Sequence, residues 1–498
     1  MNLAIVKTRV QSGMQAIPVT VEVHLSNGLP CFAMVGLPET VVKESRERVR
    51  SAILNSQFEF PDGRITVNLA PADIPKEGGR FDLPIALGIL IASMQIQGHL
   101  LEDYEFAGEL ALNGEIRPIQ AALPFAYACA QAKKSAVLPY YNCQDAGLIE
   151  GIQLYSASTL LDVCAHLQGQ HPLPLWEYQA PIHQEGDHED LADIIGQNDA
   201  KRALIVAAAG GHHLLMQGPP GTGKTMLASR LPGILPPMTD TEAIETASLY
   251  SIRGHSLDPQ AFYQRPFRRP HHTSSGVALV GGGSIPKPGE ISLAHKGVLF
   301  LDELPEFDRK VLEVLREPLE TGVIHLSRAR DQIEFPADFQ LIAAMNPCPC
   351  GYLGSKRRTC RCRPEQVLRY QNKLSGPLLD RIDLHVRLND IDHEDFLQKP
   401  KTQARSSRST QEQIMHCREK QLARQGVINA QLKNKPLETH CALQEAEQKI
   451  LLSAMRELQL SPRSTHRLLR VARTIADLED SARIMMPHLS EALGYRAA

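Results

Sequence analysis

The chain has 498 residues and a nearly balanced charge, with 53 lysines and arginines against 56 aspartates and glutamates. This length predicts several domains, and the net charge of −3 excludes a basic field over the whole surface, so contacts with nucleic acid would need local patches. The longest apolar run, Leu83 to Met94, is too short to span a bilayer, and no secretory signal is recognisable. We therefore expect a cytoplasmic protein without a membrane partner, in which the ten cysteines are reduced and clustered ones are candidates for binding metal.

The first 167 residues alternate predicted strands and helices, which indicates an α/β domain. The predicted strands are Leu3–Val10, Val19–Leu25, Arg64–Leu69 and Glu105–Leu112, and helices are expected to begin near Glu39, Leu83 and Ala121. Residues 168–190 follow, show no sustained periodicity of apolar residues, and are rich in Pro, His, Gln and acidic side chains. This composition predicts a linker.

A phosphate-binding loop is predicted between a short apolar strand that ends at Gln217 and a helix that begins at Met226. The pattern G-x-x-x-x-G-K-[ST] is satisfied by Gly218, Pro219, Pro220, Gly221, Thr222, Gly223, Lys224 and Thr225. In such a loop the backbone N–H groups hold a triphosphate, the lysine pairs with the β- and γ-phosphates, and the threonine hydroxyl ligates Mg²⁺. The sequence therefore predicts ATP and Mg²⁺ as ligands.

Two further apolar strands end in polar groups that suit ATP hydrolysis. Residues 297–301 lead to Asp302 and Glu303, where the first carboxylate would hold Mg²⁺ and the second would orient the attacking water. Residues 340–345 end at Asn346, whose amide would face the γ-phosphate. Residues 191–397 are thus predicted to form an α/β nucleotide-binding core.

Four cysteines follow Asn346 as two C-x-C pairs, Cys348 with Cys350 and Cys360 with Cys362. Four thiolates at this spacing can close a tetrahedral structural zinc site within an insert at residues 348–362. The alternative is four buried free thiols, which the solvent-seeking cations between the pairs disfavour. We therefore expect Zn²⁺ as a structural ligand.

The C-terminal part is predicted to be helical. A polar stretch at residues 398–413 is expected to be a second linker, and residues 414–498 are expected to form a helical lid. Apolar residues recur at helical spacing from Leu443 to Leu458, and Pro462 suits the first turn of a helix that continues to Leu478.

The order of these motifs is that of the AAA+ ring ATPases, and three segments carry a closer resemblance. These are residues 265–290 with the run RPFRRPHHTSS, residues 297–307, and the run NPCPCG at residues 346–351. Together they resemble the magnesium-chelatase-like AAA+ ATPases of the ComM/YifB family, and the resemblance extends over the whole chain. It implies a multidomain α/β protein with an N-terminal Lon-protease-like domain, a central AAA+ domain and a C-terminal helical lid.

The family resemblance also implies how the protein works. It indicates an ATP-hydrolysing ring, expected to be a hexamer, that acts on single-stranded or branched DNA as a helicase promoting branch migration in natural transformation and recombination. Arg381 matches the position of an arginine finger for the neighbouring subunit's ATP, although a salt bridge with an adjacent aspartate would also explain it. Arg463 is the predicted phosphate-sensing arginine of the lid, and it could instead face solvent.

Two basic segments are the predicted contacts with DNA. Residues 321–339 suggest a β-hairpin with Arg328 and Arg330 at its tip, which in similar helicases points into the central pore. Arg268 and Arg269 lie in a second cationic loop, and half of its cations could instead cap carboxylates of neighbouring subunits. A solvated hairpin tip is the alternative for the first segment.

The N-terminal domain resembles Lon-type proteases but lacks their Ser/Lys dyad. Arg80 stands at the serine position of the matching pattern, and Leu123 stands at the lysine position. We therefore expect a structural or partner-binding module rather than an active protease. The second hypothesis for the whole chain is a chelatase-like motor that remodels a partner protein.

Overall fold

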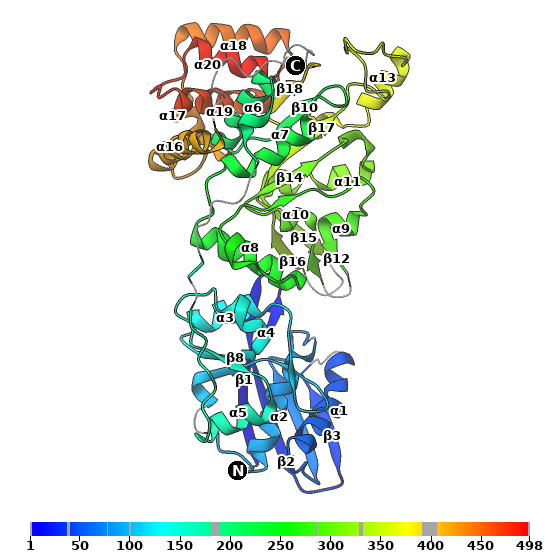
Figure 1. The fold of residues 1–498 in the computed structure, drawn as a ribbon, viewed down its shortest axis with the longest axis vertical. Coiled ribbons are helices and arrows are strands. Elements are labelled where there is room, and N and C mark those ends of the chain that lie inside the picture. The colour runs from blue at the N-terminus through cyan, green and yellow to red at the C-terminus, as the bar shows by residue number, and fades with distance from the viewer. Residues whose placement is uncertain are drawn as a thin grey trace. The chain divides into compact units, whose positions relative to one another are not determined.

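The computed structural model describes residues 2–36, 40–76, 78–98, 101–178, 180–181, 189–283, 286–327, 332–390 and 406–496. The chain forms two compact units (Figure 1). Unit 1 contains Met1–His183 and Ala243–Phe262, and unit 2 contains Gln184–Glu242 and Tyr263–Ala498. Among the described helices, none combines the length and the apolar composition that a bilayer span requires.

Unit 1 contains two main sheets. The larger has the strand order β1 (Leu3–Ser12), β2 (Gln15–Ser26), β4 (Arg64–Ala70) and β3 (Cys31–Val35). Its pairs are antiparallel except β3 with β4. The smaller sheet is parallel, in the order β5 (Tyr104–Phe106), β8 (Ser135–Pro139) and β9 (Leu154–Ala157). Alternate residues of β2 and β4 are buried, as expected for a sheet with one face against the core.

In the first segment of unit 1 the described helices are α1 (Thr40–Asn55), α2 (Asp82–Ala92), α3 (Ala122–Gln131), α4 (Tyr140–Ala146) and α5 (Leu160–Leu167). The longest apolar run of the sequence forms α2, which is buried on nearly every side in the core of unit 1. A Cβ on Gly88 would lie 2.5 Å from a methyl group of Val23 in β2. The glycine therefore permits the close approach of helix and sheet.

Two boundaries in unit 1 differ from the prediction. The strand expected over residues 105–112 is interrupted at Gly108, where a Cβ would lie 2.5 Å from a methyl group of Ile116, so the chain forms β5 and a separate β6 (Glu109–Leu110) that pairs with β7 (Ile116–Arg117). The first predicted linker begins within the core, because Leu173 is buried and the Trp176 N–H donates to the Leu154 carbonyl at 2.7 Å.

A segment of the predicted central block belongs to unit 1. It contains most of α8 (Asp240–Arg253) and continues to Phe262. The Ala121 N–H donates to the Ser251 carbonyl at 3.0 Å, and the Leu257 N–H donates to Asp145 Oδ1 at 3.2 Å. A boundary placed only at residue 167 therefore leaves out residues 243–262.

Unit 2 is built on a five-stranded parallel sheet in the order β11, β14, β17, β10 and β18. The strands are β11 (Phe267–Arg268), β14 (Val298–Leu301), β17 (Gln340–Met345), β10 (Leu214–Gln217) and β18 (Leu384–Arg387). Strands β14 and β17 are buried on both faces, as parallel strands covered by other elements are. All carboxyl ends lie along one edge, here called the carboxyl edge, and all amino ends along the opposite, amino edge.

Helices surround this sheet in unit 2. The helices that follow or precede the central strands are α6 (Asn198–Gly210), α7 (Lys224–Arg230), α9 (Gly276–Val280), α10 (Glu290–Leu293), α11 (Arg309–Val314), α12 (Pro318–Thr321), α13 (Pro364–Gln371) and α14 (Gly376–Leu379). The C-terminal helices are α16 (Ser407–Gln425), α17 (Asn434–His440), α18 (Glu445–Glu457), α19 (Pro462–Leu478) and α20 (Met486–Gly494). Helices α16 and α19 both pack on α6 (Figure 1), which joins the helical part to the core of the sheet.

The C-terminal boundaries follow local signals. Helix α19 spans the predicted residues, with Pro462 at its first position and the Ser461 side chain accepting from the Ser464 N–H at 3.1 Å. Helix α16 begins at Ser407, so the second predicted linker already contains its first two turns. The Ser406 hydroxyl caps this helix, a start signal within the polar stretch.

The predicted hairpin is present as the antiparallel strands β15 (Val323–Ser327) and β16 (Gln332–Pro336). Its expected DNA-contacting residues, Arg328 and Arg330, lie outside the described residues. Their role therefore stays a prediction.

Candidate nucleotide site and metal centre

The phosphate-binding loop connects β10 to α7 at the carboxyl edge of the sheet. Gly221 and Gly223 have φ angles of +79° and +88°, a backbone region that favours glycine. Open space surrounds the position of a Cβ at both residues, so glycine is favoured here by the backbone conformation and not by side-chain packing. These two glycines allow the loop to turn back over the end of β10.

Lys224 lies inside this loop. Its Nζ donates to the carbonyls of Gly218 at 2.6 Å and Pro219 at 2.8 Å, and to Asn346 Oδ1 at 3.2 Å. Burial lowers the pKa of Lys224 to about 8, although the charges of Asp302 and Glu303 oppose this shift. An incoming phosphate would replace neutral carbonyl partners with a charged one, which stabilises the ammonium form.

Asp302 follows β14 and lies beside the loop. Its Oδ2 accepts from the Thr225 hydroxyl at 2.9 Å and from Arg269 Nη2 at 2.8 Å. A hydroxyl and a carboxylate in contact are the oxygen ligands that Mg²⁺ prefers, and the guanidinium shows that this oxygen attracts positive charge. These residues therefore fit a magnesium ion at this point.

Glu303 differs from the adjacent Asp302 in its backbone conformation and its contacts. Its φ of 52° is uncommon for a residue other than glycine and turns the side chain away from the path of β14. Its backbone N–H donates to Asp302 Oδ1 at 3.0 Å, and its Oε2 lies 3.5 Å from His272 Nδ1. About half of the side chain is exposed, so a water molecule can reach the carboxylate.

The second cationic loop places Arg269 at this site and Arg268 beside Glu290. Arg269 follows β11, which neighbours β14, and its guanidinium also lies over the Phe300 ring at 5.5 Å. Arg268 forms a two-fold interaction with Glu290, with both distances 2.8 Å. The places of Arg268 and Arg269 therefore lend no support to the prediction that they contact DNA. Both arginines pair with carboxylates of their own chain, and their contact with DNA stays a prediction.

Sequence reasoning missed Arg269 and His272 as neighbours of the acidic pair. The available signal was that both directly follow a short strand, since polar groups at the carboxyl ends of adjacent parallel strands converge. What the sequence did not show is that this strand lies next to β14.

Arg381 and Arg463 lie together at the amino edge. Arg381 precedes β18, is buried, and donates to the Pro377 carbonyl at 2.5 Å. Both guanidinium groups form an ion pair with the same carboxylate, Glu320. Strands β10 and β18 have four residues each, so about 13 Å of sheet separates this cluster from Lys224. The predicted roles of both arginines in nucleotide chemistry stay predictions.

A buried ionic network fixes the main chain beside Arg381. Arg467 of α19 donates to the Arg381 carbonyl at 2.6 Å and to Asp383 Oδ1 at 2.7 Å. Burial disfavours the charged form of Asp383, but the His212 imidazole and the charge of Arg467 hold its pKa well below the ordinary value. The C-terminal helices therefore position Arg381.

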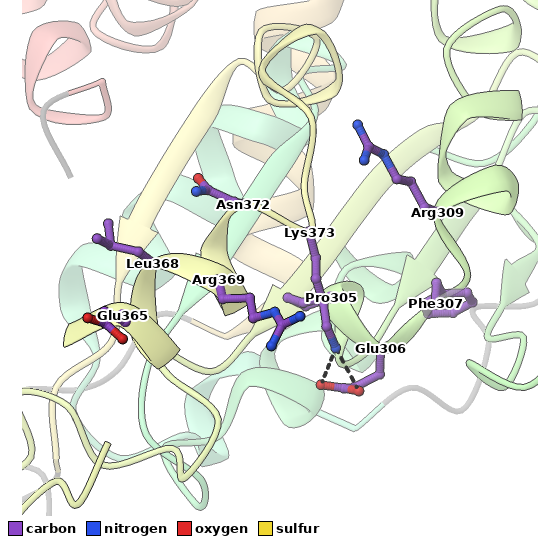
Figure 2. Close-up of a pocket in the computed structure, with 9 residues that line it drawn as sticks. All are labelled: Pro305, Glu306, Phe307, Arg309, Glu365, Leu368, Arg369, Asn372 and Lys373. Carbon is purple, nitrogen blue, oxygen red and sulfur yellow. Dashed lines mark hydrogen bonds and ion pairs between the residues drawn. The ribbon is translucent and has the colours of Figure 1, made fainter. Parts of the chain in front are cut away.

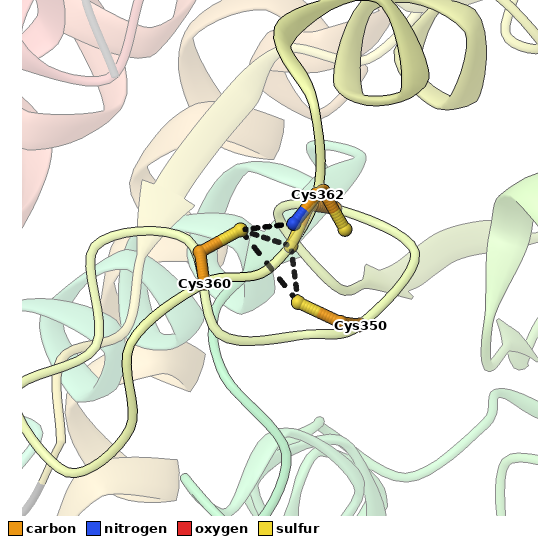
Figure 3. Close-up of side chains that lie close together, drawn as sticks. Cys350, Cys360 and Cys362 are labelled. Atoms are coloured by element: carbon orange, nitrogen blue, oxygen red, sulfur yellow. Dashed lines mark hydrogen bonds between the residues drawn. The ribbon is translucent and has the colours of Figure 1, made fainter.

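The four clustered cysteines converge, as the spacing predicts (Figure 3). Their sulfur atoms all lie within 4.8 Å of one another, and Cys348 Sγ is 3.4 Å from Cys350 Sγ and 3.6 Å from Cys360 Sγ. These separations exclude disulfides and approach the roughly 3.8 Å between thiolates around a tetrahedral zinc ion. Backbone N–H groups of Tyr352 and Arg361 lower the pKa of Cys350 to about 6. The residues therefore fit a structural zinc ion.

The two dyad positions of Lon-type proteases also come close together in unit 1. Arg80 Nη2 donates to the carbonyl of Gln120, three residues before Leu123. Leu123 itself is buried in α3. Arg80 thus contacts the chain just before α3, and neither Arg80 nor Leu123 has a side chain that can serve as a nucleophile or base.

The parallel sheet, the phosphate-binding loop and the acidic strand end define a P-loop nucleotide-binding domain followed by a helical domain. Three family models match the chain along its length. "Subunit ChlI of Mg-chelatase" matches residues 21–142, "Magnesium chelatase, subunit ChlI" matches residues 190–396, and "Magnesium chelatase, subunit ChlI C-terminal" matches residues 404–496. The chain therefore belongs to the family of AAA ATPases that resemble the ChlI subunit of magnesium chelatase.

Three relatives align with the chain over nearly their full length. The chain is 53% identical to competence protein ComM of Haemophilus influenzae, with 100% of this chain and 98% of the relative covered. It is 50% identical to the protein YifB of Salmonella typhimurium and 49% identical to YifB of Escherichia coli, each with 100% of this chain and 97% of the relative covered. These matches confirm the resemblance inferred from the motifs, and the AAA domain implies an ATPase.

Proposed function

We propose that the protein is an ATP-hydrolysing ring motor acting on DNA, a hexameric helicase that promotes branch migration in natural transformation or recombination. The observation that carries the ring is the separation of Arg381 from Lys224 on opposite edges of one parallel sheet. An arginine at the amino edge reaches a γ-phosphate only in a neighbouring copy. The proposal that DNA is the substrate rests on the full-length similarity to a protein named for competence.

The carboxyl edge supplies the groups that bind and hydrolyse the chain's own ATP. Lys224 would pair with the β- and γ-phosphates, and Asn346, already in contact with Lys224, would respond to the γ-phosphate. Thr225 and Asp302 would hold a magnesium ion, which when bound neutralises charge on the phosphates. Glu303 would orient the attacking water.

The amino edge supplies the groups for a neighbour's ATP. A cleft of about 980 Å³ lies between this edge and the C-terminal helices, and Arg463, Arg467 and Arg470 line it beside Glu320. In the ring, Arg381 would stabilise charge on the transferring phosphoryl group, with Arg463 as a second arginine. Glu320 holds both guanidinium groups until a more highly charged phosphate competes for them.

The remaining parts are assigned supporting roles. A zinc ion on the four cysteines would close the loop that follows Asn346 and give it a fixed shape. The N-terminal domain, with Arg80 and Leu123 at the dyad positions, would be a Lon-like module that binds a partner without cleaving it. This domain and the motor would share a cytoplasmic location.

A chelatase-like motor that remodels a partner protein is the second candidate. The descriptions of the three family models favour it, because all three refer to magnesium chelatase. It predicts the same nucleotide chemistry and differs only in the substrate. DNA dependence of the ATPase therefore distinguishes the two.

The test is the ATPase rate of the full chain with single-stranded, forked and four-way DNA, at low and moderate salt. The helicase predicts stimulation, and DNA binding that weakens as salt rises because phosphate contacts release counterions. Replacing Arg328 and Arg330 with Ala should reduce the slope of log Kd against log salt by about one to two if both contact phosphates. A rate that none of these DNA molecules changes would favour the partner-remodelling motor.

A further inference from the structure

The segment from Cys348 to Lys373 is strongly basic for its length. It carries seven lysines and arginines against one acidic residue, Glu365, which gives +6 in a chain whose total charge is −3. The rest of the chain therefore carries −9. A zinc ion on four thiolates would contribute −2 and leave the segment at +4. This is a local basic patch of the kind that the overall charge requires for nucleic-acid binding.

The cations of this segment are exposed. They are Lys356, Arg357, Arg358, Arg361, Arg363, Arg369 and Lys373. Within the described ranges, Arg361, Arg363 and Arg369 form no ion pair with a carboxylate. Arg358 lies over the Tyr352 ring at 5.3 Å, and Lys373 pairs with Glu306 at 3.3 Å. Most of this charge therefore faces solvent.

The backbone that presents these cations is held in place. The four cysteine sulfurs gather at the base of the loop, and Asp390 accepts from the Ser355 hydroxyl at 2.7 Å and from the Lys356 N–H at 2.8 Å. A Cβ on Gly351 would lie 2.9 Å from Pro220, so the loop also packs against the phosphate-binding loop. The basic surface is thus built on a fixed support beside the nucleotide site.

A groove continues this surface toward the catalytic glutamate (Figure 2). It encloses about 700 Å³ between η6 (Leu304–Glu306) with the start of α11 on one side and α13 with the turn after it on the other. Figure 2 shows Arg369 and Lys373 extending toward η6, and Arg309 also lines the groove. Because η6 begins directly after Glu303, a ligand in the groove contacts the short helix that follows the water-orienting residue.

The lining combines cations with exposed apolar groups. Leu368 is 58% exposed in the groove, and Leu353 is 42% exposed on the cysteine loop. A positively charged groove that tracks the phosphate backbone and an aromatic ring for bases are features of single-strand binding surfaces, and the Tyr352 ring lies among these cations. A small anion would need only one or two of the seven cations.

We propose that the cysteine loop and this groove form a binding surface for the sugar–phosphate backbone of a DNA strand. This inference rests on the proposed function and specifies where the strand lies outside the predicted pore hairpin. A phosphate in the groove competes with Glu306 for Lys373. Binding there would act on η6 and so on the orientation of Glu303.

The test measures the affinity of the full chain for a fluorescently labelled single strand, and for the duplex of the same sequence, at several salt concentrations. Two paired variants remove cations at different places, Arg361→Ala with Arg363→Ala and Arg369→Ala with Lys373→Ala. The control pair, Arg408→Ala with Lys449→Ala, removes two exposed cations from α16 and α18. Zinc content is measured for every variant, because the first pair adjoins two zinc-binding cysteines.

Each test pair should weaken single-strand binding about tenfold at low salt and reduce the salt slope by one to two, while the control pair changes affinity less than about twofold. If the unmodified chain binds the single strand and both test pairs bind it as tightly as the control pair does, this inference is wrong. That outcome would leave the proposed function standing. No binding of DNA by the unmodified chain would overturn both. Equal displacement of the strand by polyglutamate would also overturn it, since the surface would then recognise an acidic polypeptide as well as DNA.

Discussion

Both edges of the sheet in unit 2 carry acidic and basic side chains, but these side chains are available to a ligand at one edge and paired with each other at the other. At the carboxyl edge, Lys224 and Asp302 contact neutral or exchangeable partners and are open to a ligand. At the amino edge, Asp383 and Arg467 are buried in a fixed network that positions Arg381. The comparison teaches that a single sheet can bind its own nucleotide at one edge and offer a preformed arginine cluster at the other. Under the proposed function, the arginine cluster of one copy completes the nucleotide site of its neighbour.

The largest expected effect is at the amino edge. Arg381→Ala should reduce ATP turnover by about 10³-fold, because an arginine finger stabilises charge in the transition state. ATP affinity should change little, since the residue lies on the edge away from its own phosphate-binding loop. Turnover and the binding of a fluorescent ATP analogue are measured on the same preparation.

Mixing experiments provide the control for this variant. Arg381→Ala chains combined with Lys224→Ala chains should recover part of the activity, because some interfaces then pair an intact loop with an intact arginine. Arg408→Ala, which changes an exposed arginine of α16 outside the cleft at the amino edge, serves as the matched variant and should keep its turnover without mixing. No recovery in the mixture would refute action between subunits.

At the carboxyl edge, two substitutions should reduce ATP turnover for different reasons. Glu303→Gln should keep ATP binding and lower turnover about 10²-fold or more, because it removes the group that orients water. Lys224→Ala should instead weaken nucleotide binding, as it removes the charge that faces the phosphates. Calorimetric binding and steady-state turnover separate the two effects. Near-normal hydrolysis by Glu303→Gln would show that another residue orients the water.

A smaller effect should appear with pH. Burial lowers the pKa of Lys224 to about 8, so its ammonium form is mostly present at pH 7 and mostly lost at pH 9. Nucleotide affinity should therefore fall by about tenfold between these values. Lys224→Arg keeps its charge over this range and should show a much flatter profile, measured with the same ATP analogue. Equal profiles for the two proteins would assign the pH effect to another group.

The smallest effect on catalysis is expected at the cysteine cluster, which is near the carboxyl edge but touches no reacting atom. About one zinc ion per chain should co-purify if the four thiolates form one closed site. Cys348→Ser with Cys362→Ser should release it and make residues 348–362 sensitive to protease, while turnover without DNA falls less than about tenfold. Cys31→Ser is the control, since Cys31 is exposed elsewhere. Metal analysis that finds no zinc in protein prepared without chelators contradicts the assignment.

The sequence by itself determined the elements whose signals are local. The phosphate-binding loop, the strand before Asn346 and the helix from Pro462 to Leu478 lie where glycine spacing, continuous apolar runs and capping residues predict them. The same holds for the four cysteines, because a short loop brings ligands together whatever surrounds it. Each of these features depends on residues within one short stretch of the chain.

Tertiary structure alone decided which distant residues meet. Arg269 and His272 reach Asp302 and Glu303 because β11 pairs with β14, a neighbour relation that neither strand's own pattern contains. Arg463 joins Arg381 on Glu320 because α19 packs against the amino edge, and residues 243–262 leave the central block for unit 1. Local periodicity sets which face of an element is buried. It does not set which other element covers that face, and that choice depends on the packing of the whole core.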